Sequence, residues 1–337
     1  MATIIENIQT LNSIKTDIKD AILSKGGSVG NDFRTYAQAI TNLPSGGGGG
    51  TEIEDALITR TLSVYSNDRV SNVGHYAFTQ CSALTSVNFP NCTSIGSYAF
   101  SSCSALTSVD FPNCTYINQF AFTQCSALTS VNLPNCSEIS YSAFAQCSAL
   151  TSVNLPKCTS IGIGAFHTCR SLTSINLPNC TYVGYSAFAK CESLSYIDLP
   201  NCSEVYTGAF AYCSALTSIN LPNCSYVNGE AFYNCGSLTS INLPNCITIG
   251  NSTFTYCTEL SLIIIPLCTG ISRGAFIGCT NLTEVYLNSV TSVTHIYSNT
   301  FSSCPKLTSV YVPSSLFNAF KVASYWSSIS RRIVPYT

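Results

Sequence analysis

Cysteine is the residue type that first suggests chemistry in this chain, because 20 of its 337 residues are Cys. Thiolates bind zinc and form disulfides. The cysteines recur every 11 residues from Cys81 to Cys279, no Cys-x-x-Cys pair occurs, and the chain has only three His, namely His75, His167 and His295. Because zinc sites need closely spaced ligands, we expect reduced thiols in a protein core, with no metal and no cofactor.

Tyrosine is the second candidate, with 19 copies. Tyr offers a large contact area at low entropic cost and stacks on sugar rings, so tyrosines at variable positions are candidate ligand-binding residues. The alternative is that an outward Tyr merely suits strand geometry. The candidates are Tyr116, Tyr141, Tyr182, Tyr185, Tyr206 and Tyr226.

A third candidate surface is a regular column of amides and acids beside a column of Ser. Such groups bind sugar hydroxyls, or they hydrogen-bond to one another in a solvated ladder. The recurrence of the same residue types along the column favours the ladder, because a specific site needs varied groups around one ligand. The amide and acid column is Asn88, Asp110, Asn132, Asn154, Asn176, Asp198, Asn220 and Asn242.

Catalytic residues are scarce. Charged residues make up 9% of the chain, and neither a G-x-S-x-G motif nor a phosphate-binding loop occurs. Glu138 and Glu204 are 66 residues apart, which is three periods of the repeat described below and about 14 Å along a stack of strands. Glycosidases need carboxylates roughly 5–9.5 Å apart. We therefore expect a non-enzymatic protein.

Charge and hydropathy exclude two classes of partner. The formal net charge is -2, so there is no basic surplus to neutralise a phosphate backbone, and we expect no nucleic-acid partner. The longest apolar run, Leu262 to Ile265, is far shorter than the roughly 20 residues of a membrane span. The first residues lack the pattern of a secretory signal, so we expect the chain to stay in the cell or leave by another route.

The elements that position these residues follow from a 22-residue repeat. Phe recurs at this step from Phe78 to Phe276, and Phe301 follows after 25 residues, which indicates a three-residue insertion within Thr291–Ser298. The segment Thr-Ser-Val-Asn-Leu alternates and predicts a short strand, with Val131 and Leu133 pointing inward. A second short ladder is expected in the other half of the unit, and a turn of 3₁₀- or α-helix at Ala-Phe-x-x-Cys. Stacked units of this kind predict a solenoid of about eleven coils with a parallel strand ladder.

Units of the form Leu-Thr-Ser-Val-Asn-Leu-Pro-Asn-Cys-Thr-x-Ile-Gly-x-x-Ala-Phe-x-x-Cys resemble the BspA-like (Treponema-type) leucine-rich repeats. The resemblance covers about Val70 to Pro313. It implies an α/β leucine-rich-repeat solenoid that acts as a binding scaffold. The family occurs in bacterial surface adhesins, in some protists and in proteins of gut bacteriophages and prophages.

The two ends differ from the repeats and suggest a modular chain. The apolar residues Ile4, Ile8, Leu11, Ile18 and Ile22 are spaced as on an amphipathic helix, which we expect to anchor or oligomerise the chain. At the other end, Leu316–Ile329 predicts a helix whose Trp326 covers the last coil. The expected organisation is a helical anchor or oligomerisation module at 1–44, a Ser/Gly linker at 45–50, an N-terminal cap with a first partial repeat at 51–77, leucine-rich repeats at 78–313 and a C-terminal cap at 314–337.

The segments Thr35–Ile40 and Leu43–Gly46 resemble the start of tail or fibre-like proteins of gut phages and prophages. This resemblance implies a virion component, assembled in the bacterial cytoplasm, that recognises a host-surface glycan or protein. Residues 1–44 would then bind other virion proteins or form a homo-oligomer. The alternative is a BspA-like adhesin on the bacterial cell surface.

Overall fold

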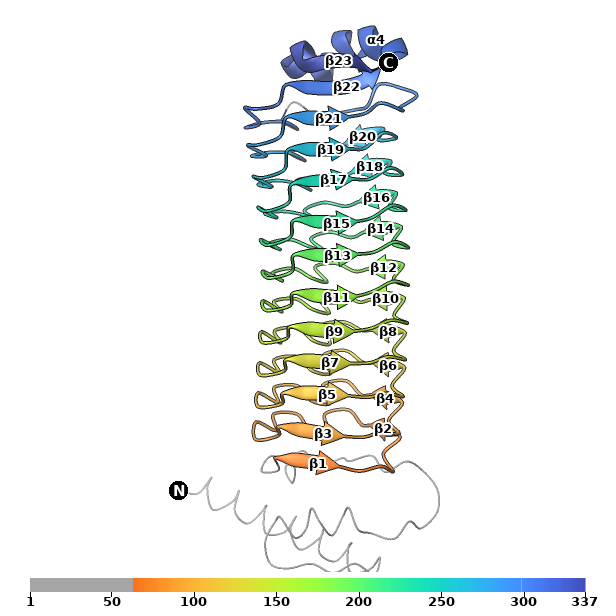
Figure 1. The fold of residues 1–337 in the computed structure, drawn as a ribbon, viewed down its shortest axis with the longest axis vertical. Coiled ribbons are helices and arrows are strands. Elements are labelled where there is room, and N and C mark those ends of the chain that lie inside the picture. Colours follow the sequence, from red (N-terminus) through yellow and green to blue (C-terminus); the bar gives the residue numbers. More distant parts are fainter. Residues whose placement is uncertain (1–62, 298, 337) are drawn as a thin grey trace, which may run out of the picture.

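The computed structural model describes residues 63–297 and 299–336, which form a straight solenoid of stacked coils (Figure 1). Each regular coil contributes one strand of three residues and one of two residues. The first ladder contains β1 (Val64–Ser66), β3 (Ser86–Asn88), β5 (Ser108–Asp110), β7 (Ser130–Asn132), β9 (Ser152–Asn154), β11 (Ser174–Asn176), β13 (Tyr196–Asp198), β15 (Ser218–Asn220), β17 (Ser240–Asn242), β19 (Leu262–Ile264), β21 (Glu284–Tyr286) and β22 (Ser309–Pro313). The second ladder contains β2 (Asn72–Val73), β4 (Ser94–Ile95), β6 (Tyr116–Ile117), β8 (Glu138–Ile139), β10 (Ser160–Ile161), β12 (Tyr182–Val183), β14 (Glu204–Val205), β16 (Tyr226–Val227), β18 (Thr248–Ile249) and β20 (Gly270–Ile271).

All pairings are parallel, and residues 22 apart lie side by side, as Ser130 does with Ser152. Among the described residues, the second ladder is one sheet of ten strands, whereas the first is divided into sheets of six, two and five strands, the last of which also contains β23 (Ile333–Tyr336). The alternation of apolar and polar residues in the sequence matches the burial of their side chains, because Val131 and Leu133 are buried and Ser130 and Asn132 are exposed. Both predicted ladders are therefore confirmed, and the fold is the predicted parallel-strand solenoid.

The third side of each coil differs from the prediction of a helical turn. The Ala-Phe-x-x-Cys segment and the residue before it form a succession of turns with two left-handed residues per coil, such as Phe120 (φ 57°) and Gln124 (φ 62°). Its N–H groups bond to the next coil: the Phe122 N–H donates to the Ala143 carbonyl at 2.7 Å, and the Gln124 N–H to the Ala145 carbonyl at 2.8 Å. These donors are used between coils, so they are not available for a helix within one coil.

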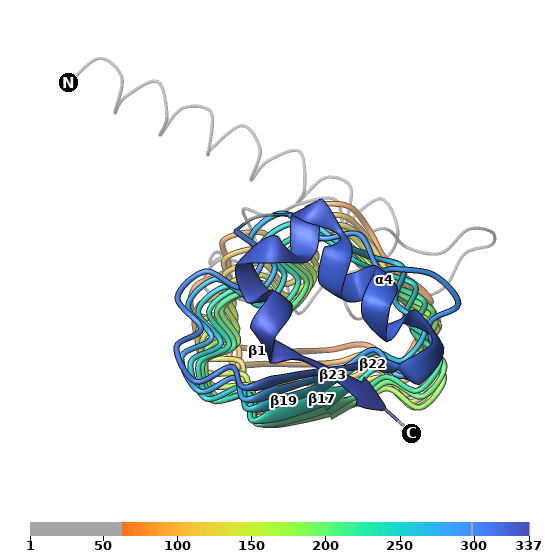
Figure 2. The ribbon, with the colours of Figure 1, turned by 90° about the horizontal axis from the view of Figure 1, so that it is seen from above.

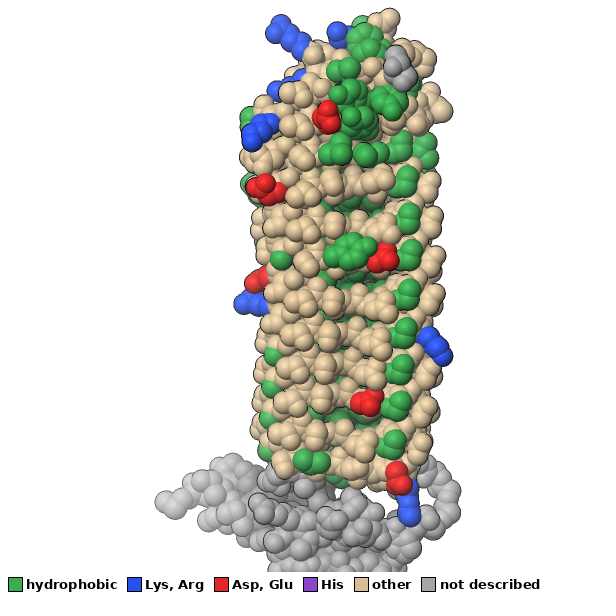
Figure 3. Space-filling model, in the orientation of Figure 1, with side chains coloured by type: hydrophobic (Ala, Val, Ile, Leu, Met, Phe, Trp, Pro, Cys, Tyr) green, Lys and Arg blue, Asp and Glu red, His purple; other side chains and the backbone are tan. Residues whose placement is uncertain are grey.

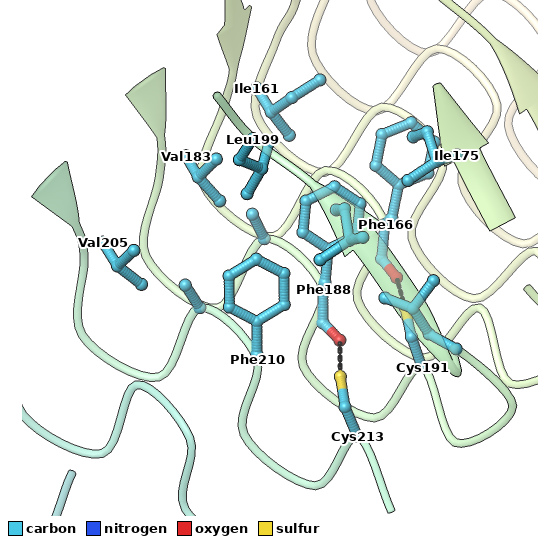
Figure 4. Close-up of a cluster of buried hydrophobic side chains, with 14 of the residues drawn as sticks. Ile161, Phe166, Ile175, Val183, Phe188, Cys191, Leu199, Val205, Phe210 and Cys213 are labelled. Carbon is cyan, nitrogen blue, oxygen red and sulfur yellow. Dashed lines mark hydrogen bonds between the residues drawn. The ribbon is translucent and has the colours of Figure 1, made fainter. Parts of the chain in front are cut away.

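The core is a column of stacked phenylalanines. Phe166, Phe188 and Phe210 lie face to face, with ring centroids 5.4 Å apart and planes within 5° of parallel (Figure 4). All three are fully buried. Offset or parallel aromatic contacts at this spacing add to the free energy of simple burial, so the column ties each coil to the next.

Two thiol columns flank the phenylalanines, and all 20 cysteines are buried. In one column the thiol donates to the Phe carbonyl of the preceding coil, as Cys213 does to Phe188 at 3.1 Å (Figure 4). In the other column it donates to the carbonyl two residues later, as Cys158 does to Ser160 at 3.3 Å. The cysteines therefore act as small apolar core residues that also satisfy buried carbonyl groups.

The C-terminal lid also differs from the single helix predicted over Leu316–Ile329. The chain forms η1 (Ser314–Leu316), α4 (Phe317–Val322) and η2 (Ser324–Arg332) and then returns as β23 (Ile333–Tyr336), which pairs with β22. Ala323 is extended (ψ 124°) and breaks the helix, so that the lid bends across the end of the solenoid (Figure 2). The predicted lid role of Trp326 is confirmed, because the side chain is fully buried and its indole N–H donates to the Thr294 carbonyl at 2.7 Å.

At the other end, β1 already pairs with β3 in the repeat register. The predicted module at 1–44, with Ile4, Ile8, Leu11, Ile18 and Ile22, the linker at 45–50 and residues 51–62 of the cap at 51–77 lie outside the described residues. In the part of the chain that the structure describes, no helix has the length and apolar character needed to cross a bilayer.

Candidate functional site

A groove of about 360 Å³ lies on the outer face of the second ladder, between β6 and β12. It combines three of the six predicted tyrosines with polar and small side chains. Its lining residues are Ser97, Tyr116, Asn118, Gln119, Glu138, Ser140, Tyr141, Ser160, Gly162, Ile163 and Tyr182.

The groove arises from the size of side chains along the strand register. The pairing places Tyr116, Glu138, Ser160 and Tyr182 in one row across four neighbouring strands. The rings at the two ends are large, whereas Ser140 and Gly162 beside the row are small. A Cβ at Gly162 would lie 2.8 Å from the Ile139 carbonyl oxygen, so no larger residue fits there without a backbone shift. The repeat thus supplies a flat sheet, and the variation in side-chain size makes it concave.

One end of the groove is held by a hydrogen bond between neighbouring coils. The Ser140 hydroxyl donates to the Tyr116 hydroxyl oxygen at 2.7 Å. Tyr116 then keeps its own proton for donation to a ligand. The ring is fixed in place before a ligand arrives, which lowers the entropic cost of binding.

The other end is a cluster of three tyrosines. The Tyr206 ring lies 4.9 Å from Tyr182 and 5.2 Å from Tyr185, centroid to centroid. Burial raises the pKa of Tyr182, and the neighbouring Tyr185 and Glu204 raise it further. The hydrogen bond with Glu204 is the main cause of the raised pKa of Tyr206. Both phenols therefore stay protonated at neutral pH and can donate hydrogen bonds.

Five of the six predicted tyrosines thus lie on one continuous surface. Tyr116, Tyr141 and Tyr182 line the groove, and Tyr182 joins it to Tyr185 and Tyr206. Tyr226 is on the same ladder, two strands beyond Tyr182, but it does not line the groove. Sequence reasoning missed Asn118, Ser140, Gly162 and Ile163, although the small residues among bulky ones were a signal for a hollow.

A second run of aromatic residues leads away from the groove. Tyr76, Tyr98 and Phe120 are stacked, with centroids 5.0 and 4.7 Å apart, and Tyr141 meets Phe120 edge-on at 4.8 Å. Tyr76 at the far end of this run is 54% exposed, so aromatic surface also extends beyond Tyr141, away from the groove.

The alternative surface, the amide column on the first ladder, is partly used by its own hydrogen bonds. The Asn154 amide donates to Asn132 at 3.0 Å, and the Asn132 amide donates to the Asp110 carboxylate at 2.9 Å. Figure 3 shows this face as polar with few charges. Figure 3 also shows hydrophobic side chains in a patch at its C-terminal end and in a narrow column along one edge. Tyr286 on β21 and Tyr311 on β22 stack with ring centroids 4.4 Å apart.

Within residues 63–297 and 299–336, no group of three or more His, Cys, Asp or Glu side chains is arranged to hold a metal ion. The arrangement on the second ladder is suited to noncovalent binding, because it presents aromatic rings, hydroxyls, amides and one exposed carboxylate, Glu138, around a hollow.

The chain is similar to known proteins in its repeats and its fold. Residues 59–160, 137–261 and 225–335 match the family described as BspA type leucine rich repeat region. A leucine-rich repeat protein from Bacteroides ovatus has 22% sequence identity and a TM-score of 0.58, with 82% of this chain and 85% of that chain covered. The pneumococcal vaccine antigen PcpA has 18% identity and a TM-score of 0.50, with 82% and 79% covered. At these identities the two structures show a common fold.

None of the curated proteins compared with the chain matches it. The family match spans 59–335, which is most of the 337 residues, and its repeats are those seen in the two ladders, the phenylalanine column and the thiol columns. The chain therefore belongs to the family of BspA type leucine-rich repeat proteins.

Proposed function

We propose that the protein is a non-enzymatic adhesin of the bacterial cell surface and that the groove on its second ladder binds a host-surface glycan. Family membership supports the surface adhesin over the virion component. The observation that carries the ligand class is the groove between Tyr116 and Tyr182, with hydroxyl and carboxylate groups between its aromatic ends.

The chemistry of the groove favours a sugar. Tyr rings contact the apolar faces of pyranose rings, and side chains such as Ser160 and Glu138 exchange hydrogen bonds with sugar hydroxyls. A volume of about 360 Å³ lies in the range of small-ligand sites. A protein partner is the other candidate from the sequence, but stable protein interfaces need about 800 Å² per partner, usually around a central apolar core.

The test is binding to a glycan array, followed by calorimetry on the best ligand, with Tyr182→Ala and Tyr116→Ala. We expect each to weaken binding at least tenfold, which corresponds to the loss of about 1.4 kcal/mol or more. Tyr196→Ala is the matched control, because Tyr196 is also exposed but lies on β13 of the first ladder. Equal losses in all three variants, or no glycan ligand on the array, would refute the proposed site.

Location is tested separately by labelling intact bacterial cells with an antibody against the repeats. Labelling without lysis supports the surface adhesin. The second candidate is the virion component, which rests on the anchor-like pattern of residues 1–44 and their resemblance to phage proteins. It requires the chain to be detected by mass spectrometry in purified particles, attached through that segment to other virion proteins or to copies of itself.

A further inference from the structure

A second and larger cavity, of about 520 Å³, lies beside the last coils. It is separate from the tyrosine groove, by which we mean the groove between Tyr116 and Tyr182. The cavity is lined by Arg273, which follows β20, and β20 is four strands beyond β12 in the second ladder, or about 19 Å at ordinary strand spacing. We propose that this cavity is a binding site for a carboxylate-bearing sugar, with Arg273 as the group that binds the carboxylate.

The three-residue insertion in the repeat builds one wall of this cavity. His295 extends the second ladder by a parallel bridge to Gly270. The insertion is held from inside, because the fully buried Thr294 donates its hydroxyl to the Cys268 carbonyl at 2.7 Å. The Thr294 carbonyl in turn accepts the indole N–H of Trp326 from the lid.

The same segment fixes the position of Tyr297. The Tyr297 N–H donates to the hydroxyl of the buried Thr300 at 3.0 Å, and the Thr300 N–H donates back to the Tyr297 carbonyl at 3.0 Å. The Tyr297 ring and the Ile277 side chain give the cavity an apolar surface, and Asn251, Ser252 and Asn299 give it polar groups. The wall is therefore anchored at both the backbone and the side chains before a ligand is bound.

Arg273 supplies the charge. Its guanidinium lies 5.9 Å from the centre of the Tyr297 ring. The single ion pair among the residues described joins Arg170 to Glu192, so no carboxylate of that part of the chain occupies the Arg273 guanidinium. The guanidinium holds five N–H donors in a planar fork that fits a carboxylate, and it lies within cation–π range of the Tyr297 ring.

These features together select the ligand class. A simple anion would need the guanidinium alone, whereas the ring of Tyr297, the side chain of Ile277 and the amides fit the rest of a sugar. The volume is large enough for more than the carboxylate group. An acidic sugar, such as a uronic acid unit or a sialic acid, has both the carboxylate and the ring that these groups match.

The experiment is calorimetric titration of the full chain with galacturonic acid trisaccharide, a hyaluronan tetrasaccharide and sialyllactose, each compared with its neutral methyl ester. We expect at least one acid to bind, with the ester and Arg273→Gln each weakening binding at least tenfold. Arg273 is exposed, so this variant keeps the fold. Arg170→Gln removes the same charge from an exposed side chain outside the cavity, and we expect a change below about twofold.

Several outcomes would overturn the proposal: no binding of any of the three acids, equal binding of acid and ester, or unchanged binding by Arg273→Gln. Competition by inorganic phosphate as effective as by the sugar would show a simple anion site instead, which also overturns it. Tyr182→Ala should leave this binding unchanged, so failure of this site and failure of the tyrosine groove are distinguishable.

Discussion

The thiol of Cys191 donates a hydrogen bond to the carbonyl oxygen of Phe166, one coil earlier, at 3.2 Å. The same carbonyl accepts the N–H of Cys169 from its own coil at 3.1 Å. Each phenylalanine carbonyl of this type therefore receives one bond within the coil and one from the next coil. The cysteine column acts as a series of links between coils, in addition to filling the core.

We expect Cys191→Ala to lower the free energy of unfolding by about 1–3 kcal/mol, because it removes the link and leaves a small cavity. Ser193→Ala is the control in the same coil, since Ser193 is exposed and its replacement should change stability by less than about 0.5 kcal/mol. Urea unfolding followed by circular dichroism measures both. Equal midpoints for Cys191→Ala and the wild type would show that the link contributes nothing.

Stability should fall steeply at alkaline pH. Burial raises the pKa of Cys213 to about 12 and of Cys158 to about 11, from 9.0 for a free thiol. Unfolded thiols therefore lose protons from about pH 9 upward while the folded ones keep theirs, so their contribution is complete below pH 9 and is lost as the pH rises toward 11 and 12. The urea midpoint should be constant near neutral pH and decline above pH 9, whereas thiolate absorbance of the folded protein should appear only as the pH approaches 11 to 12. Thiolate absorbance of the folded protein already near pH 9 would contradict the raised pKa values.

The repeat made the architecture predictable, because residues such as Val131 and Phe166 recur in equivalent surroundings and their period fixes which columns are buried. The tyrosine groove was predictable only as a set of candidate residues. Its depth depends on how Tyr116 lies against Ser140 and on the absence of a side chain at Gly162, and these are contacts between unlike coils. The cavity beside Arg273 was signalled by the 25-residue step, but sequence alone does not say to which side an insertion folds.

A pair of glycines tests how closely the coils approach. A Cβ at Gly250 would meet the backbone of Gly229 and would lie 2.5 Å from the Asn228 carbonyl carbon, whereas at Gly236 the nearest atom would be the Thr258 hydroxyl at 3.7 Å. We expect Gly250→Ala to cost at least about 1–3 kcal/mol, because backbone must shift. Gly236→Ala should stay within about 0.5 kcal/mol of the wild type. Thermal unfolding of the two variants gives the comparison, and equal melting temperatures would contradict the close approach of the coils at Gly250.

Trp326 of the lid should stabilise the folded conformation of the last coils. Its ring packs against Phe320 with centroids 5.1 Å apart, and its N–H is bonded to the Thr294 carbonyl, which belongs to the inserted segment. Trp326→Phe keeps most of the packing but leaves that carbonyl unpaired, at a cost of about 1–3 kcal/mol. Trp326→Ala also opens a cavity and should cost about 3–5 kcal/mol.

Because each coil contacts only its neighbours, the loss should be confined to the C-terminal end. Hydrogen exchange should become faster in the segment from Thr294 to Tyr297 and in the last coils, more for Trp326→Ala than for Trp326→Phe, while the coils around Phe100 keep their wild-type rates. Uniformly faster exchange along the solenoid would mean that the stack unfolds as one cooperative unit. Unchanged exchange at Thr294 would mean that the indole bond does not hold the inserted segment, and the wall beside Arg273 would then depend on the Thr294 hydroxyl bond to Cys268 and on the bridge of His295 to Gly270.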